Sequence, residues 1–172
     1  ILNEERAKLS KRHGAVSVEE FRDRGYLPQA LLNFIALLGW NPGDDREVLS
    51  LEEMVDEFRF ERVSKSGAVF DREKLNWMNQ QYLLKLPEEE YFRMIDDVIQ
   101  KGDYHNQDSG KIRQAAEILK TRLVTLSDLN QKLGLFFEEN PEIKDLQAIE
   151  VLKEENSKTV LKEFLQQAEN LD

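Results

Sequence analysis

The chain has 172 residues and a mass of 20.2 kDa, which is enough for one ordinary domain or two small ones. Hydrophobic residues make up 40% of it and charged residues 34%, so it can bury a core and is not disordered throughout. It has no cysteine, which excludes disulfides, thiolate zinc sites and cysteine nucleophiles. Its two histidines, His13 and His105, are too few for a histidine-rich metal site. No apolar run approaches the ~18–20 residues that a membrane-spanning helix needs.

The net charge of −10 is unevenly distributed along the chain. Residues 1–86 carry 13 Lys and Arg against 15 Asp and Glu, a net charge of −2, whereas residues 87–172 carry 11 against 19, a net charge of −8. This acidity argues against broad nonspecific binding to phosphate backbones, so any nucleic-acid contact needs a local basic patch. The one dense basic patch spans residues 8–13.

The first predicted elements are two helices joined by a short turn. Ser17 and Glu20 have the spacing of a capping box, which predicts a short helix that ends near Gly25. Pro28 fits the first turn of the next helix, and its apolar residues follow the 3.6-residue period. Gly39 is a plausible end for that helix, and residues 41–44 have the composition of a turn.

Further along, Ser50 and Glu53 repeat the capping-box spacing, and Asp71 is suited to cap another helix. Between them, residues 59–63 alternate in the manner of a short strand, and residues 66–67 form a turn signal.

A change in composition at Leu86-Pro87 predicts a domain boundary, because a proline followed by three glutamates suits the start of a helix. We therefore predict domains over 1–86 and 87–172. The fold class expected from the whole chain is mainly α with a minor strand element. The helices expected after the boundary cover 87–101, about 109–122, 127–137, 141–153 and 157–170, with a polar break at 102–110.

The segment most informative about chemistry is Lys8-Leu9-Ser10-Lys11-Arg12. Two lysines three residues apart, with a small hydroxyl residue between them, suit a mobile cationic loop. Such a loop can fold over a polyphosphate and neutralise the charge that develops as the leaving group departs. A solvated basic turn explains the same five residues equally well, since short basic runs are common.

This segment resembles the Lys-Met-Ser-Lys-Ser signature loop of class I aminoacyl-tRNA synthetases, in the Lys-Leu-Ser-Lys-Arg form of glutamyl-tRNA synthetases. Residues 25–33 and 37–40 resemble the segment that follows the loop in that family, as do residues 70–79 with Tyr82. The order and spacing agree over residues 4–86. The helical remainder is similar in class to the bacterial-type anticodon-binding region but contains no sharp motif.

The resemblance implies that glutamate and ATP react to glutamyl-adenylate and pyrophosphate, and that the glutamyl group then passes to tRNA. By motif position, Lys11 and Lys8 are the candidate catalytic residues, and Lys8, Leu9, Ser10, Lys11 and Arg12 are the candidate nucleotide-binding residues. ATP, with Mg²⁺ in the complete enzyme, is the expected cofactor. No metal site is expected in this chain, nor any cofactor bound to it alone.

The family's Rossmann half, with its His-Ile-Gly-His signature, would precede Ile1. We therefore expect a C-terminal fragment that is inactive alone, comprising a signature loop and tRNA stem-contact module over 1–86 and a helical, incomplete anticodon-binding region over 87–172. The implied partners are tRNA(Glu), with tRNA(Gln) open, and glutamate and ATP through the absent half. The protein is expected to be a monomer in the cytoplasm that does not bind a membrane. An organellar form of a bacterial-type enzyme is the alternative.

Several side chains have two interpretations. Trp77 and Tyr82 are expected in the core rather than on tRNA, since aromatic residues at helical spacing usually pack inside. Asn76 and Asn79 either contact an RNA backbone or satisfy local groups. A further set of basic residues could face RNA or form a solvated helix face: Lys111, Arg113, Lys120 and Arg122. Phe136 and Phe137 are expected in the core.

Two other functions remain open at this point. The chain could be a helical protein–protein interaction module with an incidental basic loop, which its acidity favours slightly. It could also be a truncated paralogue that modifies tRNA without an anticodon domain, although the helical region after Pro87 argues against this.

Overall fold

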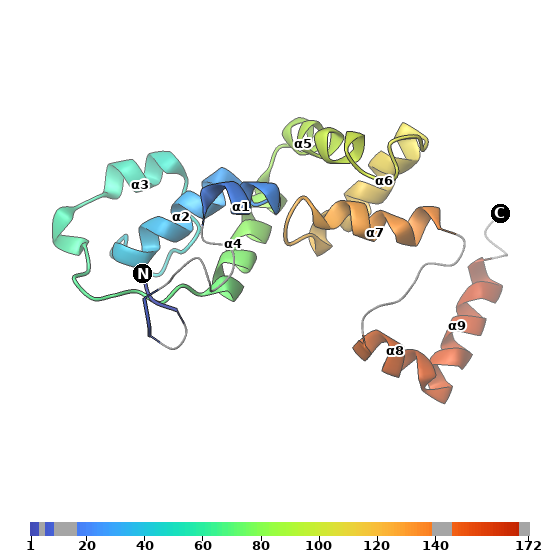
Figure 1. Ribbon diagram of the computed structural model, residues 1–172. Helices are drawn as coiled ribbons and strands as arrows, with labels where there is room; N and C mark the ends of the chain where they lie inside the picture. The colour runs from blue at the N-terminus through green and yellow to red at the C-terminus, as the bar shows by residue number, and fades with distance from the viewer. Residues whose placement is uncertain (4–5, 9–16, 139–145, 169–172) are drawn as a thin grey trace. The chain divides into compact units, whose positions relative to one another are not determined.

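The computed structural model describes residues 1–3, 6–8, 17–138 and 146–168, and their regular secondary structure is almost entirely helical (Figure 1). Two compact units are distinguished, Ile1–Phe137 and Glu138–Asp172. The mainly α prediction is confirmed. The helices are α1 (Val18–Asp23), α2 (Pro28–Gly39), α3 (Leu51–Glu57), the 3-10 helix η2 (Phe60–Arg62), α4 (Arg72–Lys85), α5 (Glu88–Gln100), α6 (Ser109–Leu119), the 3-10 helix η3 (Lys120–Arg122), α7 (Asp128–Phe137), α8 (Leu146–Lys153) and α9 (Glu155–Ala168).

The helix starts of the first half follow the sequence signals. The Ser17 hydroxyl accepts a hydrogen bond from the Glu20 amide, and the Glu20 carboxylate accepts one from the Ser17 amide, which completes a capping box on α1. Ser50 and Glu53 repeat this arrangement on α3. The Asp71 carboxylate accepts from the Lys74 amide at 2.9 Å and caps α4. Each cap satisfies an amide that would otherwise lack a partner at the helix start.

The strand predicted over 59–63 is wrong, because this segment forms η2. Five alternating residues specify a strand only where a neighbouring strand can pair with them. In the described residues, pairing here is limited to one isolated bridge between Val63 and Trp40. The Phe60 side chain is 81% exposed and packs edge-on against Phe58, with 5.3 Å between the ring centroids.

The predicted helix bounds after Pro87 need small corrections. Pro87 is the N-cap of α5 rather than its first helical residue, and the helix expected to continue to residue 122 changes to η3 at Lys120. The last helix begins at Glu155, two residues before the expected Ser157, because a glutamate is favourable in the first turn of a helix. Residues 139–145 lie outside the described residues.

The core of Ile1–Phe137 crosses the sequence position at which we predicted a domain boundary. Leu27 of the α1–α2 turn, Ala30 of α2 and Leu83 of α4 are buried in one cluster with residues of α5, α6 and α7. Tyr91 and Leu133 are among those partners, at 1% and 0% exposure. A second cluster joins α1, α2 and α4, and a third lies between α2 and α3. The boundary at 86/87 stays a prediction.

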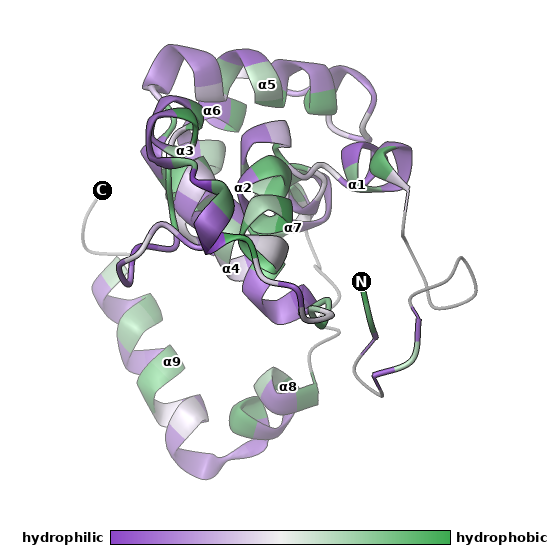
Figure 2. Cartoon of the chain, turned by 90° about the vertical axis from the view of Figure 1, so that its left-hand side faces the viewer, coloured by the Kyte–Doolittle hydropathy of each residue, from purple (hydrophilic) through white to green (hydrophobic). Residues whose placement is uncertain are grey.

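Figure 2 shows how the helices distribute hydrophobic residues: α2 is hydrophobic over much of its surface, whereas α5 presents hydrophilic residues on its outer side. The expectation that Phe136 lies in the core is wrong, since it is 45% exposed near the end of α7. Phe137 is partly buried against Tyr104, with ring centroids 5.6 Å apart. None of the helices in the described ranges is long and apolar enough to cross a membrane.

Candidate functional site

The predicted nucleotide-binding loop lies largely outside the residues that the structure describes. Of its five residues the structure describes Lys8, whose side chain is exposed and whose backbone pairs with Leu2 in an isolated antiparallel bridge. The other predicted loop residues, Leu9, Ser10, Lys11 and Arg12, and also His13, lie outside the described residues. The assignment of catalysis to Lys11 and Lys8 therefore stays a prediction.

The first residues of the chain hold Lys8 beside the start of α4. The Leu2 amide donates to the Ala68 carbonyl at 2.9 Å, and the Phe70 amide donates to the Leu2 carbonyl at 2.8 Å. Leu2 also forms a parallel bridge with Val69, so it pairs with both Lys8 and the segment that leads into α4. The base of the loop is thereby connected to a helix more than 60 residues away in sequence.

Asn3 and Ala7 are hydrogen-bonded to each other between Leu2 and Lys8. The Asn3 amide donates to the Ala7 carbonyl at 2.8 Å, and the Ala7 amide donates to the Asn3 Oδ1 at 2.7 Å. Arg6 has a φ of 60°, in the left-handed region that a non-glycine residue seldom adopts. The Arg6 amide donates to the Asn3 carbonyl at 2.9 Å, so Asn3 is bonded to both Arg6 and Ala7.

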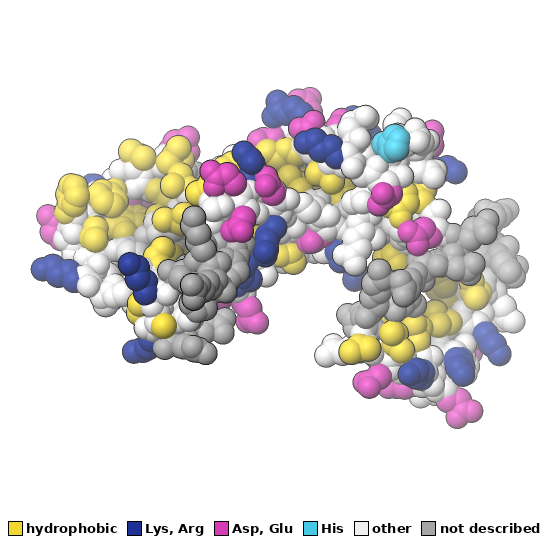
Figure 3. Space-filling view, in the orientation of Figure 1, with side chains coloured by type: hydrophobic (Ala, Val, Ile, Leu, Met, Phe, Trp, Pro, Cys, Tyr) yellow, Lys and Arg dark blue, Asp and Glu magenta, His cyan; other side chains and the backbone are white. Residues whose placement is uncertain are grey.

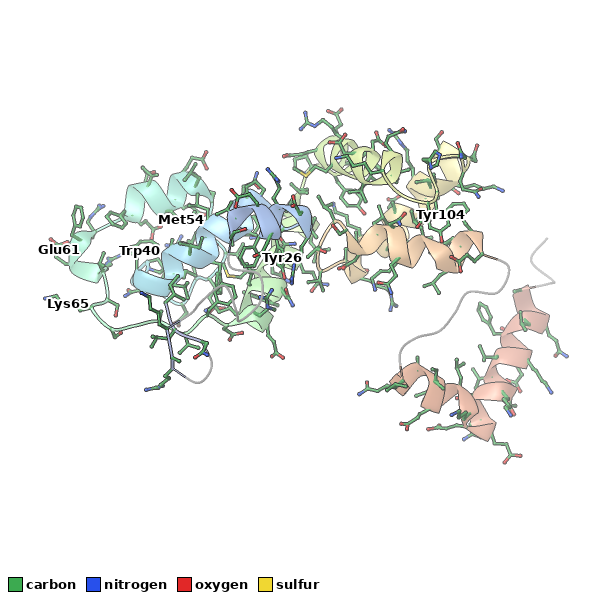
Figure 4. All side chains as sticks on the ribbon, in the orientation of Figure 1. Tyr26, Trp40, Met54, Glu61, Lys65 and Tyr104 are labelled. Carbon is green, nitrogen blue, oxygen red and sulfur yellow. The ribbon has the colours of Figure 1, made fainter. Side chains whose placement is uncertain are left out.

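Two candidate residues on α4, Trp77 and Asn76, lie in different environments. Trp77 is 42% exposed, so the expectation that it lies in the core is wrong, and its ring is available to a partner. The Asn76 Oδ1 accepts a hydrogen bond from the hydroxyl of Tyr26, which lies at the turn between α1 and α2 (Figure 4). Asn76 therefore satisfies a local group.

Tyr82, also on α4, connects three elements. Its hydroxyl donates to the Leu49 carbonyl and lies 2.9 Å from the Oδ1 of Asn33, which is fully buried. Burial raises the pKa of the Tyr82 hydroxyl to about 12, and the nearby Glu53 carboxylate adds to the rise. Tyr82 is thus a neutral structural donor at ordinary pH, and its packing role agrees with the interpretation that we preferred.

The basic residues after Pro87 do not form a single free face. The Arg113 guanidinium lies 3.7 Å from the Asp96 carboxylate and 5.0 Å from the centroid of the Phe92 ring. Lys120 donates to the Leu86 carbonyl at 3.1 Å and lies over the ring of Tyr91. Lys111 and Arg122 are exposed. Two of these four cations therefore have structural partners, and two face solvent.

An exposed aromatic surface lies at η2, where the sequence pattern predicted a strand and did not indicate such a surface. Phe58 and Phe60 are 42% and 81% exposed, and Val55 of α3 is 66% exposed. Figure 3 shows hydrophobic side chains gathered at this end of the molecule, and Figure 4 places Glu61 and Lys65 beside it. The signal in the sequence was the alternation of aromatic and charged residues in Phe58–Arg62.

Arg46 is the centre of a cluster of ion pairs before and on α3. Arg46 bonds to the Asp44 carboxylate at 2.8 Å and to the Glu57 carboxylate at 2.6 Å. Hydrogen bonds from Arg46 lower the pKa of the exposed Asp44. Within the described residues, no three His, Asp or Glu side chains are grouped to hold a metal ion.

Two family models match this chain, and they adjoin on α4. The model of the class I tRNA synthetases for glutamate and glutamine, catalytic domain, matches residues 1–77. The model of the anticodon binding domain matches residues 75–172, more than half of the chain. The chain belongs to the anticodon-binding-domain family. Its first part is also a match to the catalytic domain, so the resemblance inferred from residues 4–86 is confirmed.

Named relatives agree with these matches. Glutamate--tRNA ligase 1 of Syntrophomonas wolfei is 41% identical over 172 residues, which is 99% of this chain and 35% of the relative. Glutamate--tRNA ligase 1 of Pseudothermotoga lettingae is 44% identical over 144 residues, which is 84% of this chain and 30% of the relative. The chain thus spans about a third of the length of these ligases.

Solved structures give the same result for the fold. A glutamate tRNA ligase of Elizabethkingia meningosepticum, solved in complex with its amino acid, matches with a TM-score of 0.67 and 30% identity. The match covers 95% of this chain and 36% of that one. The glutamate-tRNA synthetase of Elizabethkingia anophelis matches with a TM-score of 0.69 and 31% identity, over 87% of this chain and 33% of that one.

Proposed function

We propose that this chain is the part of a glutamate–tRNA ligase that carries the ATP-phosphate signature loop and the anticodon-binding helices. The observation that carries the proposal is that a catalytic-domain match containing residues 8–12 continues directly into an anticodon-binding-domain match on α4. In the complete ligase, glutamate attacks the α-phosphate of ATP, glutamyl-adenylate forms and pyrophosphate leaves. The activated glutamyl group then passes to tRNA.

Lys11 is the proposed catalytic residue of the loop. Its ammonium would stabilise the charge that develops on the departing pyrophosphate, so its interaction is stronger in the transition state than with bound ATP. Lys8 would bind the phosphates and hold the loop. Leu9, Ser10 and Arg12 would complete the nucleotide contacts. Lysine suits these positions because a point charge on a flexible stem can follow phosphate oxygens as they move.

The exposure of Lys8 supports the role proposed for it. The Lys8 side chain is exposed, and its backbone is held by Leu2 at the base of the loop, so its ammonium can reach a phosphate in solution. Mg²⁺ would be bound mainly by the phosphates of the nucleotide. The 172 residues contain no His-Ile-Gly-His sequence, and we expect no glutamate-dependent pyrophosphate exchange from them alone.

The proposed macromolecular partner is tRNA(Glu), and recognition of tRNA(Gln) by the same ligase is the open alternative. Trp77 on α4 is exposed and suited to contact a ribose or base, and Lys111 and Arg122 are exposed cations for phosphates. We expect the ligase to act as a monomer in the cytoplasm, with an organellar enzyme as the alternative.

The test of the catalytic assignment uses the complete ligase with Lys11→Ala and Lys8→Ala, measured by pre-steady-state adenylate formation at saturating glutamate with tRNA present. Lys11→Ala should lower the rate ~10²–10³-fold, comparable to the loss of one oxyanion donor, with a much smaller change in the KM for ATP. Lys8→Ala should show a smaller loss. A Lys11→Ala rate within about twofold of the parent would show that the loop is a solvated basic turn.

A second candidate function is a helical protein–protein interaction module, favoured by the acidic charge and by the exposed aromatic surface at η2. Titration of the 172-residue chain with tRNA, with and without excess mixed RNA polymer, separates the two. Because the chain has one short basic patch, tRNA should bind in the range of ~10⁻⁴–10⁻⁶ M and be released as salt rises. Absence of any tRNA complex at low salt would favour the interaction module.

A further inference from the structure

One buried polar side chain hydrogen-bonds to both halves of the Ile1–Phe137 unit. Asn79 of α4 is 0% exposed. Its Oδ1 accepts a hydrogen bond from the Leu27 amide at 2.8 Å, at the α1–α2 turn. Its Nδ2 donates to the Val124 carbonyl at 2.5 Å, in the segment between η3 and α7. One amide therefore connects the module that carries the signature loop to the helices that follow residue 87.

The chemistry of this position selects asparagine. Leu27 presents an N–H group and so requires an acceptor, while Val124 presents a carbonyl and so requires a donor, which fixes the orientation of the Asn79 amide. A carboxylate supplies no donor at neutral pH, and an aliphatic side chain supplies neither group. Loss of the amide would leave the buried Leu27 N–H and the partly buried Val124 carbonyl without this partner.

Further contacts beside Asn79 cross the same junction. The Leu126 amide donates to the Gly25 carbonyl at 3.1 Å, and the Gln80 Nε2 donates to the Thr121 carbonyl at 3.0 Å. Gly25 has a φ of +79°, and a Cβ there would lie 2.6 Å from the Ser127 amide nitrogen. The two backbones thus approach too closely for any other residue at position 25.

The segment between η3 and α7, which contains Val124, is itself bonded to and packed against the helices that follow residue 87. The Asp128 Oδ2 accepts from the Val124 amide at 2.9 Å and from the Thr125 amide at 2.8 Å. Leu123 and Leu129, on either side of this loop, are fully buried in the core cluster shared with α5 and α6. A bond from Asn79 to Val124 therefore acts on the whole α5–α7 bundle rather than on a free loop.

We propose that Asn79 is a positioning residue, which fixes the α5–α7 bundle relative to the signature-loop module so that both contact one tRNA molecule at the same time. This inference rests on the proposed function. When two modules are held at a fixed geometry, binding of a rigid ligand by one gives a high effective concentration for its contact with the other. This advantage falls when the connection between the modules becomes flexible. Asn79 would thus act through geometry and without touching RNA.

The experiment compares Asn79→Leu with Asn76→Leu in the 172-residue chain. Asn76 lies on the same helix and its bond to Tyr26 stays within one module, which makes it a matched control. Affinities are measured by fluorescence anisotropy at low salt for three labelled RNAs: tRNA(Glu), an anticodon-arm hairpin, and tRNA(Glu) without its anticodon arm. The parent chain should bind intact tRNA more tightly than either part.

Asn79→Leu should weaken binding of intact tRNA about tenfold or more while it changes the affinity for each partial RNA less than twofold. Asn76→Leu should leave all three affinities within twofold. An equal loss for all three RNAs with Asn79→Leu would mean that the residue only maintains the fold, and an unchanged affinity for intact tRNA would equally overturn the inference. A parent chain that binds none of the RNAs would instead overturn the proposed function.

A second variant and a second readout guard against misfolding. Gln80→Leu removes the bond to Thr121 at the partly exposed edge of the joint and should weaken binding of intact tRNA severalfold, again without an effect on the partial RNAs. Because the chain has no cysteine, Val55→Cys on α3 and Glu117→Cys on α6 can carry spin labels at unique sites. The measured distance distribution should broaden with Asn79→Leu and stay narrow with Asn76→Leu. A distribution that stays narrow in both would contradict the proposal.

Discussion

The two compact units of the molecule differ in how far their helices bury side chains. In Ile1–Phe137, α2, α4, α5, α6 and α7 each contribute buried side chains to a core. In Glu138–Asp172, the described residues of α8 and α9 include none that is buried, and α9 exposes Leu161 and Phe164. The sequence predicts helices in both units. Isolated short helices are marginal in water, so burial, rather than helical pattern, separates a stable unit from a weakly held one.

The largest effect that tests this comparison is expected at Leu83 on α4. This side chain is fully buried, in the core that α4 shares with α5, α6 and α7. Leu83→Ala should lower the free energy of unfolding by ~2–5 kcal/mol, the range for a buried leucine. Guanidinium titration followed by tryptophan fluorescence measures it. A loss below about 1 kcal/mol would contradict a core shared across residue 87.

A smaller effect is expected from alkaline pH through Tyr91, whose hydroxyl donates to the Ala116 carbonyl at 2.8 Å in the interior. Burial raises the pKa of Tyr91 to about 12, above the value of ~10 in an unfolded chain. The unfolded state then releases its proton first, so the stabilisation is complete below pH 10 and is lost between pH 10 and about 12. Urea titrations across this range should show the decline. Tyr91→Phe should reduce the decline and cost ~1 kcal/mol at neutral pH.

The smallest effect is expected in α9. Leu161 is 45% exposed, and Leu161→Ala should change the unfolding free energy of Ile1–Phe137 by less than ~0.5 kcal/mol, which is typical of surface substitutions. The same guanidinium titration used for Leu83→Ala provides the measurement. A shift as large as that of Leu83→Ala would mean that α9 is part of the same cooperative core.

Local signals in the sequence predicted the helix starts well, because a cap depends on residues three positions apart. Ser17 with Glu20, Ser50 with Glu53, and Asp71 all cap the helices expected of them. The strand at 59–63 failed because a strand needs a partner that alternation cannot reveal. The prediction that Trp77 lies in the core was wrong for a related reason. Helical spacing placed this residue on a helix but could not show which side of α4 packs against a neighbouring element.

The candidate site was predictable in part. Residues 8–12 and the pattern over residues 4–86 were sufficient to identify the family, since both depend on order and spacing along the chain. The role of Asn79 was not predictable, because its two partners lie 52 and 45 residues away and are backbone groups. Any residue type at positions 27 and 124, proline at 27 excepted, would offer the same N–H and carbonyl.

The shared core around Leu27 and Leu83 also limits how this protein can be divided or recombined. A chimaera made by exchanging everything after Leu86 would have to match a donor's α5–α7 surface to Leu27, Ala30 and Leu83, which are all at most 2% exposed here. An exchange after Phe137 cuts where one compact unit ends. Crossovers at the second position should therefore yield soluble hybrids far more often than crossovers at the first.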